Sequence, residues 1–280
     1  MISVSNEDFR YFARTISQAS RYDFSGYSEK SFIRRLQKIL VDYKTDLHHL
    51  VKRIKTDEAF LQKIVNEITV NTTELFRDPS IWHTLRYKVL PRFQNKRNIN
   101  IWHAGCSTGQ EVYSMLILLN EMGLMDKSKI LATDINTQAL DIAKRGLYKY
   151  RFNIGYLDNF DKVIKENPFN YDEFYDVPYN RYFKIDKVKD SIQMHPFLIE
   201  KPFYRVHDLA VDGNLLVNNF DIVMCRNVII YFNYELQNRV FDLFYKSMFD
   251  QGILFLGKHE TILGPFASKF QKKVDYYIKV

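Results

Sequence analysis

Residues 99–111, INIWHAGCSTGQE, decide the fold of this chain. The first six are mostly apolar, which predicts a short β-strand over 99–104, and a helix is expected over 111–119. The glycines between them, at 105 and 109, predict a tight turn in which the backbone can approach a ligand closely. A strand that ends in a glycine turn and opens a helix is typical of α/β sheets, which bind ligands at the carboxyl ends of their strands.

The same alternation continues towards the C-terminus. We expect helices over 136–145 and 234–249, and further strands over 130–133, 220–225, 252–257 and 274–280. This pattern predicts an α/β fold, a mostly parallel, twisted sheet with helices on both faces.

A helical segment precedes this sheet. Apolar residues recur with the period of a helix over 7–70, where three helices are indicated. Asp57 is expected to cap the third, and Pro79 to begin a further helix. We therefore divide the chain into an N-terminal helical domain, residues 1–75, and an α/β domain, residues 76–280.

The segment over about 149–206 breaks the alternation. It is rich in Tyr and Phe and is interrupted by prolines. Its strand-like stretches, at 181–185, 191–194 and 204–206, predict a small antiparallel β-subdomain inserted into the α/β domain.

The composition is that of a soluble globular protein, since 46% of the 280 residues are hydrophobic and 26% are charged. No apolar run could span a membrane and no secretory signal is visible, so we expect a cytoplasmic protein. The only cysteines, Cys106 and Cys225, rule out a disulfide scaffold. The histidines lack the spacing of a metal site, so no metal is expected.

Basic residues outnumber acidic ones by 40 to 33, a net charge of +7. This favours an acidic partner but does not separate nucleic acid from an acidic protein surface. Many basic residues lie in the early helical segment: Arg34, Arg35, Lys38, Lys44, Lys52, Arg53 and Lys55. They predict either a docking surface or a solvated helix face.

Two features indicate the kind of ligand. The turn at 105–109 lacks the Gly-x-Gly-x-x-Gly of dinucleotide sites, so a pyrophosphate is not expected, and taken alone the turn could be a mere connection. Asp134, at the end of the second strand, is placed either to accept the hydroxyls of a ribose or to cap the next helix.

Several short motifs together resemble one family. They are Asn71-x-Thr73 with Phe76-Arg77, Ser107-Thr108-Gly109-x-Glu111-x-Tyr113-Ser114, Thr133-Asp134-Ile135, Arg181-Tyr182-Phe183, Asp208-Leu209, and Cys225-Arg226-Asn227-Val228 with Tyr231-Phe232. In this combination the chain resembles the CheR-type chemoreceptor glutamate methyltransferases, which use S-adenosylmethionine. The resemblance covers nearly the whole chain and implies a Rossmann-like class I methyltransferase fold.

The resemblance also implies a cofactor site for S-adenosylmethionine, made by Asn71, Thr73, Arg77, Gly105, Glu111, Asp134, Asp208, Leu209, Asn227 and Val228. Arg77 suits the carboxylate of the cofactor and Glu111 its ammonium group. Alternatively, Arg77 could pair with Glu74 or Asp78, and Glu111 could simply lie on a helical turn. Tyr231 and Arg77 are expected to orient the acceptor, although Tyr231 could instead be a packed aromatic.

The implied reaction methylates glutamate carboxylates of chemoreceptors and leaves S-adenosylhomocysteine. Glutamate has a pKa of about 4.3 and is ionised at neutral pH, so no general base is needed and positioning does the work. The implied partners are the cytoplasmic methylation helices of membrane chemoreceptors. These would dock on the basic helices through Arg34, Arg35, Lys38, Lys52 and Arg53.

Three other functions stay open, and one of them is a methyltransferase with a different protein acceptor. A methyltransferase of nucleic acids would suit the charge, but the chain lacks an Asn-Pro-Pro-Tyr-like motif and an evident RNA-binding module. A non-catalytic module that only binds the cofactor is disfavoured, because all the polar residues of the implied site are present.

The chain also departs from the family. Gln110, Val112 and Asp208 replace the usual residues of its motifs, and the segment over 146–181 is longer than usual. The hairpin over 187–190 lacks the glycines typical of members that tether a receptor peptide. Substrate docking is therefore less well predicted than the cofactor pocket.

Overall fold

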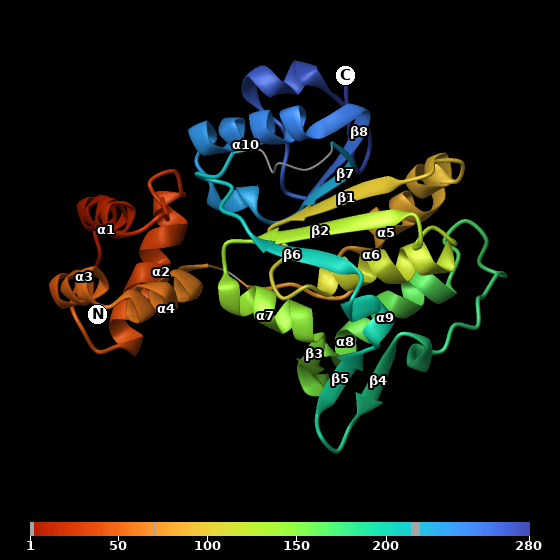
Figure 1. Ribbon diagram of the computed structural model, residues 1–280, viewed down its shortest axis with the longest axis horizontal. Helices are drawn as coiled ribbons and strands as arrows, with labels where there is room; N and C mark the ends of the chain where they lie inside the picture. The colour runs from red at the N-terminus through yellow and green to blue at the C-terminus, as the bar shows by residue number, and fades with distance from the viewer. Residues whose placement is uncertain (1–2, 70, 214–218) are drawn as a thin grey trace.

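The computed structural model describes residues 3–69, 71–213 and 219–280, and its larger part is a sheet between two layers of helices (Figure 1). In spatial order the strands are β6 (Pro202–Val206), β2 (Ser128–Asp134), β1 (Ile99–Ala104), β7 (Phe220–Cys225), β8 (Met248–Leu256), β10 (Tyr277–Lys279) and β9 (Phe270–Lys272). The first five run parallel, and β10 and β9 close the sheet antiparallel. The predicted mostly parallel α/β sheet is confirmed.

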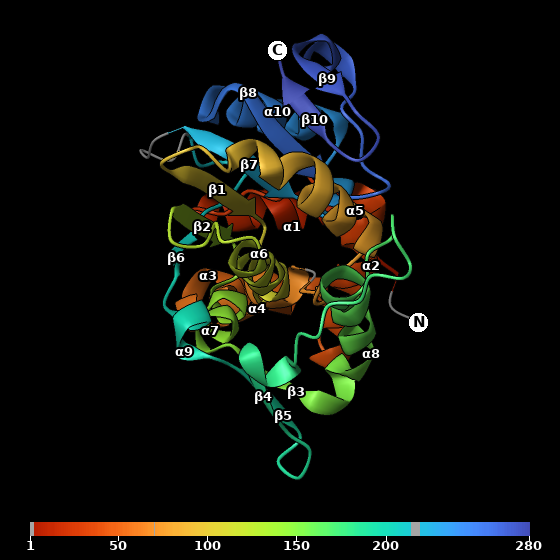
Figure 2. The same ribbon diagram turned by 90° about the vertical axis from the view of Figure 1, so that its right-hand side faces the viewer.

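Helices cover both faces because the central strands are apolar on both faces. One face is covered by α6 (Gln110–Glu121) and α7 (Thr137–Arg145), below the sheet in Figure 2, and by α5 (Pro79–Thr84), whose buried residues share the core of α6. The other face is covered by α10 (Tyr234–Ser247), above the sheet. On β1, Ile101 belongs to the core on the α6 side, whereas Trp102 faces α10, where the ring centroid of Phe244 lies 5.4 Å from its own. Neighbouring residues of one strand thus anchor opposite layers.

Shorter turns complete the α/β domain. α5 continues into the π-helix η1 (Leu85–Val89) and the 3₁₀ turn η2 (Leu90–Phe93), and two more 3₁₀ turns are η5 (Ile229–Tyr231) and η6 (Gly264–Lys269). The helix expected over 234–249 ends at Ser247, because residues from Met248 onward already pair in β8. In the part of the chain that the structure describes, no helix is both long and apolar enough to cross a bilayer.

Four helices form the N-terminal helical domain, at the left of Figure 1: α1 (Asn6–Ala19), α2 (Glu29–Asp42), α3 (Leu47–Thr56) and α4 (Glu58–Ile68). They enclose a core of their own, in which Phe12, Ile16 and Leu36 are fully buried. Asp57 caps α4 as predicted, since its Oδ1 accepts a hydrogen bond of 2.9 Å from Phe60 N. α3 is a fourth helix where the periodicity indicated three.

The inserted antiparallel sheet differs from the prediction in one strand. Its order is β3 (Leu147–Lys149), β5 (Ser191–Met194) and β4 (Phe183–Asp186). The strand expected here over 204–206 belongs instead to β6 of the main sheet, where Tyr204 pairs with Ala132. Pro202 lacks an N–H, which suits the edge position that β6 occupies, but the local sequence does not reveal which sheet the edge belongs to.

The rest of the insertion packs against the α/β domain. α8 (Tyr150–Phe160) continues into the π turn η3 (Asp161–Lys165), and η4 (Tyr179–Arg181) and α9 (Pro196–Ile199) follow. Phe160 is fully buried, and its ring centroid lies 5.9 Å from that of Phe76. The longer segment therefore contributes to the hydrophobic core through Phe160, whereas its Tyr171 and Phe174 are exposed.

Two sets of contacts hold the helical domain against the carboxyl ends of the strands. Asn136 is fully buried and caps α7, and its Nδ2 donates hydrogen bonds to Asn66 O at 3.0 Å and to Thr69 Oγ1 at 2.7 Å. On the other side of the sheet edge, Tyr27 forms an antiparallel β-bridge with Phe232. The helical domain is thus fixed beside the sheet at two places.

Replacing Asn136 by alanine removes a helix cap and both inter-domain hydrogen bonds. We expect the free energy of unfolding to fall by about 3 kcal/mol, measured by chemical denaturation. Asn233→Ala is the matched control, because Asn233 caps α10 and its side chain makes no inter-domain bond; it should cost about 1 kcal/mol. Equal losses in the two variants would show that the inter-domain bonds add nothing.

Candidate cofactor and active site

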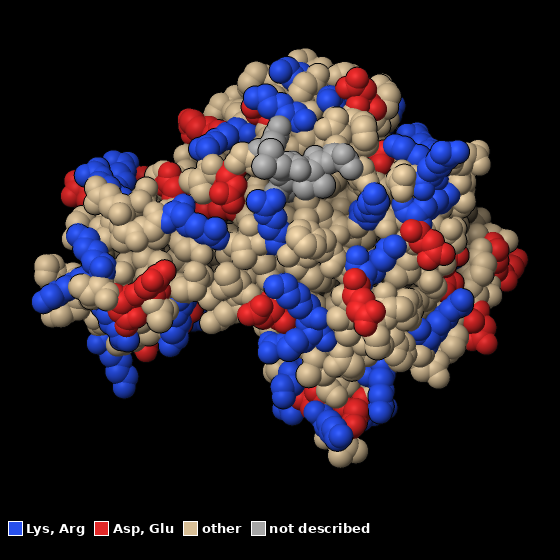
Figure 3. Space-filling model, in the orientation of Figure 1, with Lys and Arg blue, Asp and Glu red and all other residues tan. Residues whose placement is uncertain are grey.

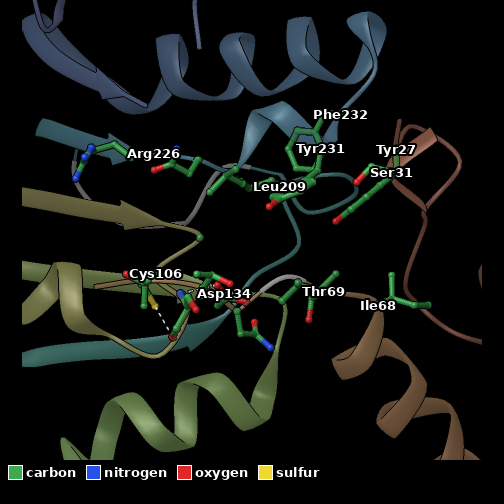
Figure 4. Close-up of a pocket in the computed structure, with 18 of the residues that line it drawn as sticks. Tyr27, Ser31, Ile68, Thr69, Cys106, Asp134, Leu209, Arg226, Tyr231 and Phe232 are labelled. Carbon is green, nitrogen blue, oxygen red and sulfur yellow. Dashed lines mark hydrogen bonds between the residues drawn. The ribbon is translucent and has the colours of Figure 1, made fainter. Parts of the chain in front are cut away.

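A pocket lies where the carboxyl ends of β1, β2, β6 and β7 meet the helical domain (Figure 4). Every residue predicted for the cofactor or for catalysis lines it: Asn71, Thr73, Arg77, Gly105, Glu111, Asp134, Asp208, Leu209, Asn227, Val228 and Tyr231. The space, its open mouth included, is about 1030 Å³, enough for a nucleoside-sized ligand. The structure thus brings the predicted residues together, while their individual roles stay predictions.

The glycine turn forms one wall. Gly105 has φ +79°, and the N–H groups of Gly105 and Cys106 donate to Thr133 O at 2.8 and 2.9 Å, which ties the turn to β2. A Cβ added at Gly105 would lie 2.5 Å from Val228 Cγ2. Glycine is therefore required both by the left-handed backbone and by the close approach of the loop after β7.

Asp134 is held in place by main-chain donors. Its Oδ2 accepts from Ser107 N at 2.7 Å and its Oδ1 from Asn136 N at 2.8 Å. Burial raises the pKa of Asp134, and these hydrogen bonds oppose that rise. The cap of α7 is Asn136 and not Asp134, and Asp134 lines the pocket, while its role towards a ribose stays a prediction.

A buried charge network lies behind the pocket. The Arg226 guanidinium donates to Glu111 Oε2 at 3.1 Å, to Asp78 Oδ2 at 2.8 Å and to Arg77 O at 2.8 Å, and Glu111 Oε1 lies 3.0 Å from His103 Nδ1. Burial alone would raise the pKa of Glu111, but the bond to His103 and the charge of Arg226 hold it below its ordinary value. Glu111 therefore stays anionic.

The network removes one of the two ion-pair partners that the sequence offers for Arg77. Asp78, a candidate partner of Arg77 in the sequence, binds Arg226 instead. Glu74 is the other candidate, and its Oε1 lies 4.0 Å from Arg77 Nε, at the limit of an ion pair. The Arg77 guanidinium is thus left to line the pocket. The sequence predicts no role for Arg226, although the motif contains it, because its partners Glu111 and Asp78 lie 115 and 148 residues away in the chain.

Several buried polar atoms of the pocket wall have no hydrogen-bond partner among the described residues. They are Ser107 Oγ, His207 Nδ1, Asp208 Oδ2 and Arg226 Nε. The other oxygen of Asp208 accepts from Ala210 N at 2.8 Å. An unsatisfied buried polar atom costs about 1–3 kcal/mol, so these atoms fit a polar ligand such as the nucleoside of the expected cofactor.

The helical domain supplies the wall opposite the sheet. Tyr27, Ser31 and Arg35 from around the start of α2 line the pocket, and so does Thr69 after α4. No sequence motif marks these residues, so their place could not be predicted. Tyr231 lines the pocket and also packs against the core on the α10 side, as expected of a packed aromatic, while its role towards the acceptor stays a prediction.

Backbone strain gathers around the same pocket. Phe76, Asp78, Ser107 and Asn227 have φ between +51° and +59°, a left-handed conformation that is costly for residues other than glycine. Both cysteines are buried free thiols, and Cys106 lines the pocket. Among the residues described, no group of His, Cys, Asp or Glu side chains could hold a metal ion.

Gly105→Ala tests how tightly the turn and the loop after β7 close the pocket. We expect the affinity for S-adenosylhomocysteine, measured by calorimetry, to fall by about tenfold or more, because Val228 must move. Gly123→Ala is the control, since Gly123 has a comparable φ of +65° but nothing within 4 Å of an added Cβ. That variant should lose about 1 kcal/mol of stability and keep its affinity.

Comparison with known proteins identifies the family. A family model described as "CheR methyltransferase, SAM binding domain" matches residues 71–160 and 165–277, and one described as "CheR methyltransferase, all-alpha domain" matches residues 7–69.

The chain is 33% identical to a Pseudomonas putida protein named as the methyltransferase Cher3, over 98% of this chain and 97% of that protein. It is 28% identical to a chemotaxis protein methyltransferase of Listeria monocytogenes, over 95% and 94% of the two chains. A namesake from Vibrio anguillarum is 29% identical, over 96% and 94%. S-adenosylmethionine is therefore the cofactor of this chain, which belongs to the CheR methyltransferase family.

Proposed function

We propose that this chain transfers the methyl group of S-adenosylmethionine to glutamate side-chain carboxylates of chemoreceptors, in the adaptation step of chemotaxis. The products are glutamate methyl esters and S-adenosylhomocysteine. The observation that carries the proposal is the one cavity lined by Arg77, Glu111 and Tyr231 together with the glycine turn. Relatives named chemotaxis protein methyltransferases support the chemotactic role.

Charge and hydrogen-bonding capacity assign the groups of the cofactor. Bound S-adenosylmethionine supplies a methyl group activated by a sulfonium. Arg77 would bind its carboxylate and Glu111, which stays anionic, its ammonium group. Asp134 would accept the ribose hydroxyls, and the unpartnered oxygen of Asp208 would accept from the base. The remaining predicted contacts are Asn71, Thr73, Gly105, Leu209, Asn227 and Val228.

The acceptor needs positioning and no general base. A glutamate carboxylate is ionised at neutral pH, so its oxygen attacks the methyl carbon while the sulfur–carbon bond breaks and sulfur keeps the electron pair. The protein must hold that oxygen in line, about 3 Å from the methyl carbon, and exclude water. Tyr231 and Arg77 are the polar groups of the pocket that we assign to this task.

We place the acceptor on the helical domain. Arg35 of α2 lines the pocket and also a neighbouring groove, where Lys38 and Lys63 add positive charge. Asp42 and Glu67 line the same groove, so basic residues exceed acidic ones there by a single charge. Arg53 of α3 instead lies over the Phe60 ring, 3.8 Å from its centroid. Figure 3 shows Lys and Arg side chains on several parts of the visible face, so the groove, more than the net charge, indicates where an acidic helix would dock.

The reaction can be tested with methyl-labelled S-adenosylmethionine and membranes of the source cell. Carboxyl methyl esters release volatile labelled methanol in alkali, so the wild type should yield it. Arg77→Ala should lose about 100-fold or more, because both cofactor and acceptor lose a charged partner. Arg97→Ala, at the exposed opposite end of β1, should behave as wild type. Cofactor binding without volatile label from the wild type would refute carboxyl methylation.

Asp208 makes a pH dependence expected. Burial, together with the charges of Asp212 and Asp23, raises the pKa of Asp208 from 3.8 to about 6, against the opposing effects of Ala210 N and Arg21. The carboxylate that accepts from the base is therefore lost as the pH falls through about 6. The same shift lets the folded state bind the proton more tightly than the unfolded state, so this group favours folding more as the pH falls from 6 towards 4.

The affinity for S-adenosylhomocysteine should consequently weaken about tenfold between pH 7.5 and pH 5, without unfolding caused by Asp208. Asp208→Asn keeps one acceptor oxygen and cannot titrate, so its affinity should stay nearly constant over this range. Calorimetry at the two pH values measures both proteins. An equal pH dependence in the variant would assign the effect to another group.

A further inference from the structure

The loop that follows β7 is held by a carboxylate from a distant part of the chain. Glu260 lies in the segment after β8 and is 8% exposed. Its Oε1 accepts from Val228 N at 2.9 Å and Ile230 N at 3.2 Å, and its Oε2 from Asn227 N at 2.8 Å and Gly257 N at 2.6 Å. Four main-chain donors thus converge on one side chain that no sequence motif singled out.

We propose that Glu260 is a positioning residue for methyl transfer, which fixes loop 226–231 so that Asn227, Val228 and Tyr231 face the pocket. Its effect on the cofactor follows from the loop geometry alone. Its effect on the acceptor rests on the proposed function. Glu260 itself does not line the pocket, so it acts only through the loop.

The geometry requires a carboxylate at this position. No ion pair within the described ranges involves Glu260, so its charge is balanced by main-chain dipoles that point at it, as in other anion-binding loops. Asn227, with φ +59°, turns its N–H towards this centre. A Cβ at Gly257 would lie 2.7 Å from Glu260 Oε2 and 2.9 Å from Asn227 N, so the arrangement leaves no spare room.

The fixed loop links the two halves of the reaction site. At one end Val228 closes on the glycine turn at Gly105, and at the other Tyr231 O accepts from Ser28 N of the helical domain at 2.8 Å. A small shift of the loop therefore moves the cofactor wall and the acceptor wall together. If Glu260 contributed only to packing, by contrast, its replacement would lower the stability of the protein without changing turnover by the folded enzyme.

Glu260→Gln tests the proposal, because it keeps the size of the side chain while one of its acceptor oxygens becomes an NH₂ group facing main-chain N–H donors. We expect kcat for receptor methylation to fall by about 100-fold and the dissociation constant of S-adenosylhomocysteine to rise by about tenfold. Hydrogen exchange should accelerate at residues 227–230 and stay unchanged in the core strands. Glu260→Asp keeps the charge and should recover part of the turnover.

Two further variants keep the result decisive. Gly257→Ala pushes the carboxylate aside without changing charge and should reproduce the pattern of Glu260→Gln. Glu200→Gln, at an exposed site after α9, should match wild type. Wild-type turnover and affinity in Glu260→Gln, or faster exchange throughout the molecule, would overturn the proposal. If the wild type methylates no receptor, the proposed function fails, whereas the affinity and exchange measurements still decide the role of Glu260.

Discussion

The active site depends on one buried cation. The side chain of Arg226 is 1% exposed, and its guanidinium bonds to Glu111, to Asp78 and to the carbonyl of Arg77. A buried charge is tolerated only when paired, so losing either carboxylate would leave this arginine uncompensated. Because β7 pairs with β1, its end lies beside the start of α6, and one side chain can join three separate segments. The strained backbone at Asp78 and Asn227 persists within this framework.

Much of the fold could be predicted from hydrophobic patterns. β1 and β7 have the predicted bounds, because a short apolar run between turn residues in an α/β chain can form few structures other than a buried strand. β6 was assigned to the wrong sheet, since pairing with β2 or with the inserted strands is decided by contacts far apart in sequence. β3 and β9, of three residues each, are too short to give a periodic signal.

The site was predictable wherever a motif supplied the residue and not where the tertiary fold did. The glycine turn, Asp134 and the Asn-Val pair after β7 carry chemical patterns that survive in a linear sequence. Glu260 and Tyr27 carry none, yet one holds the loop and the other lines the pocket. Their contribution arises from main-chain hydrogen bonds and from domain packing. Both depend on which segments lie together in the folded chain, and not on the spacing of residues along the sequence. For the same reason the sequence could not predict that Asp78 forms an ion pair with Arg226 and not with Arg77.

The separate core of the helical domain has an evolutionary consequence. Its buried residues, such as Phe12, Ile16 and Ile64, pack among themselves, while outward-facing residues of α2 and α4 line the groove beside the pocket. Substitutions at those outward-facing positions leave both the helical core and the sheet-edge contacts undisturbed. Most such surface changes cost little stability. The outer surface of the helical domain can therefore diverge among relatives while the buried residues of both domains are kept.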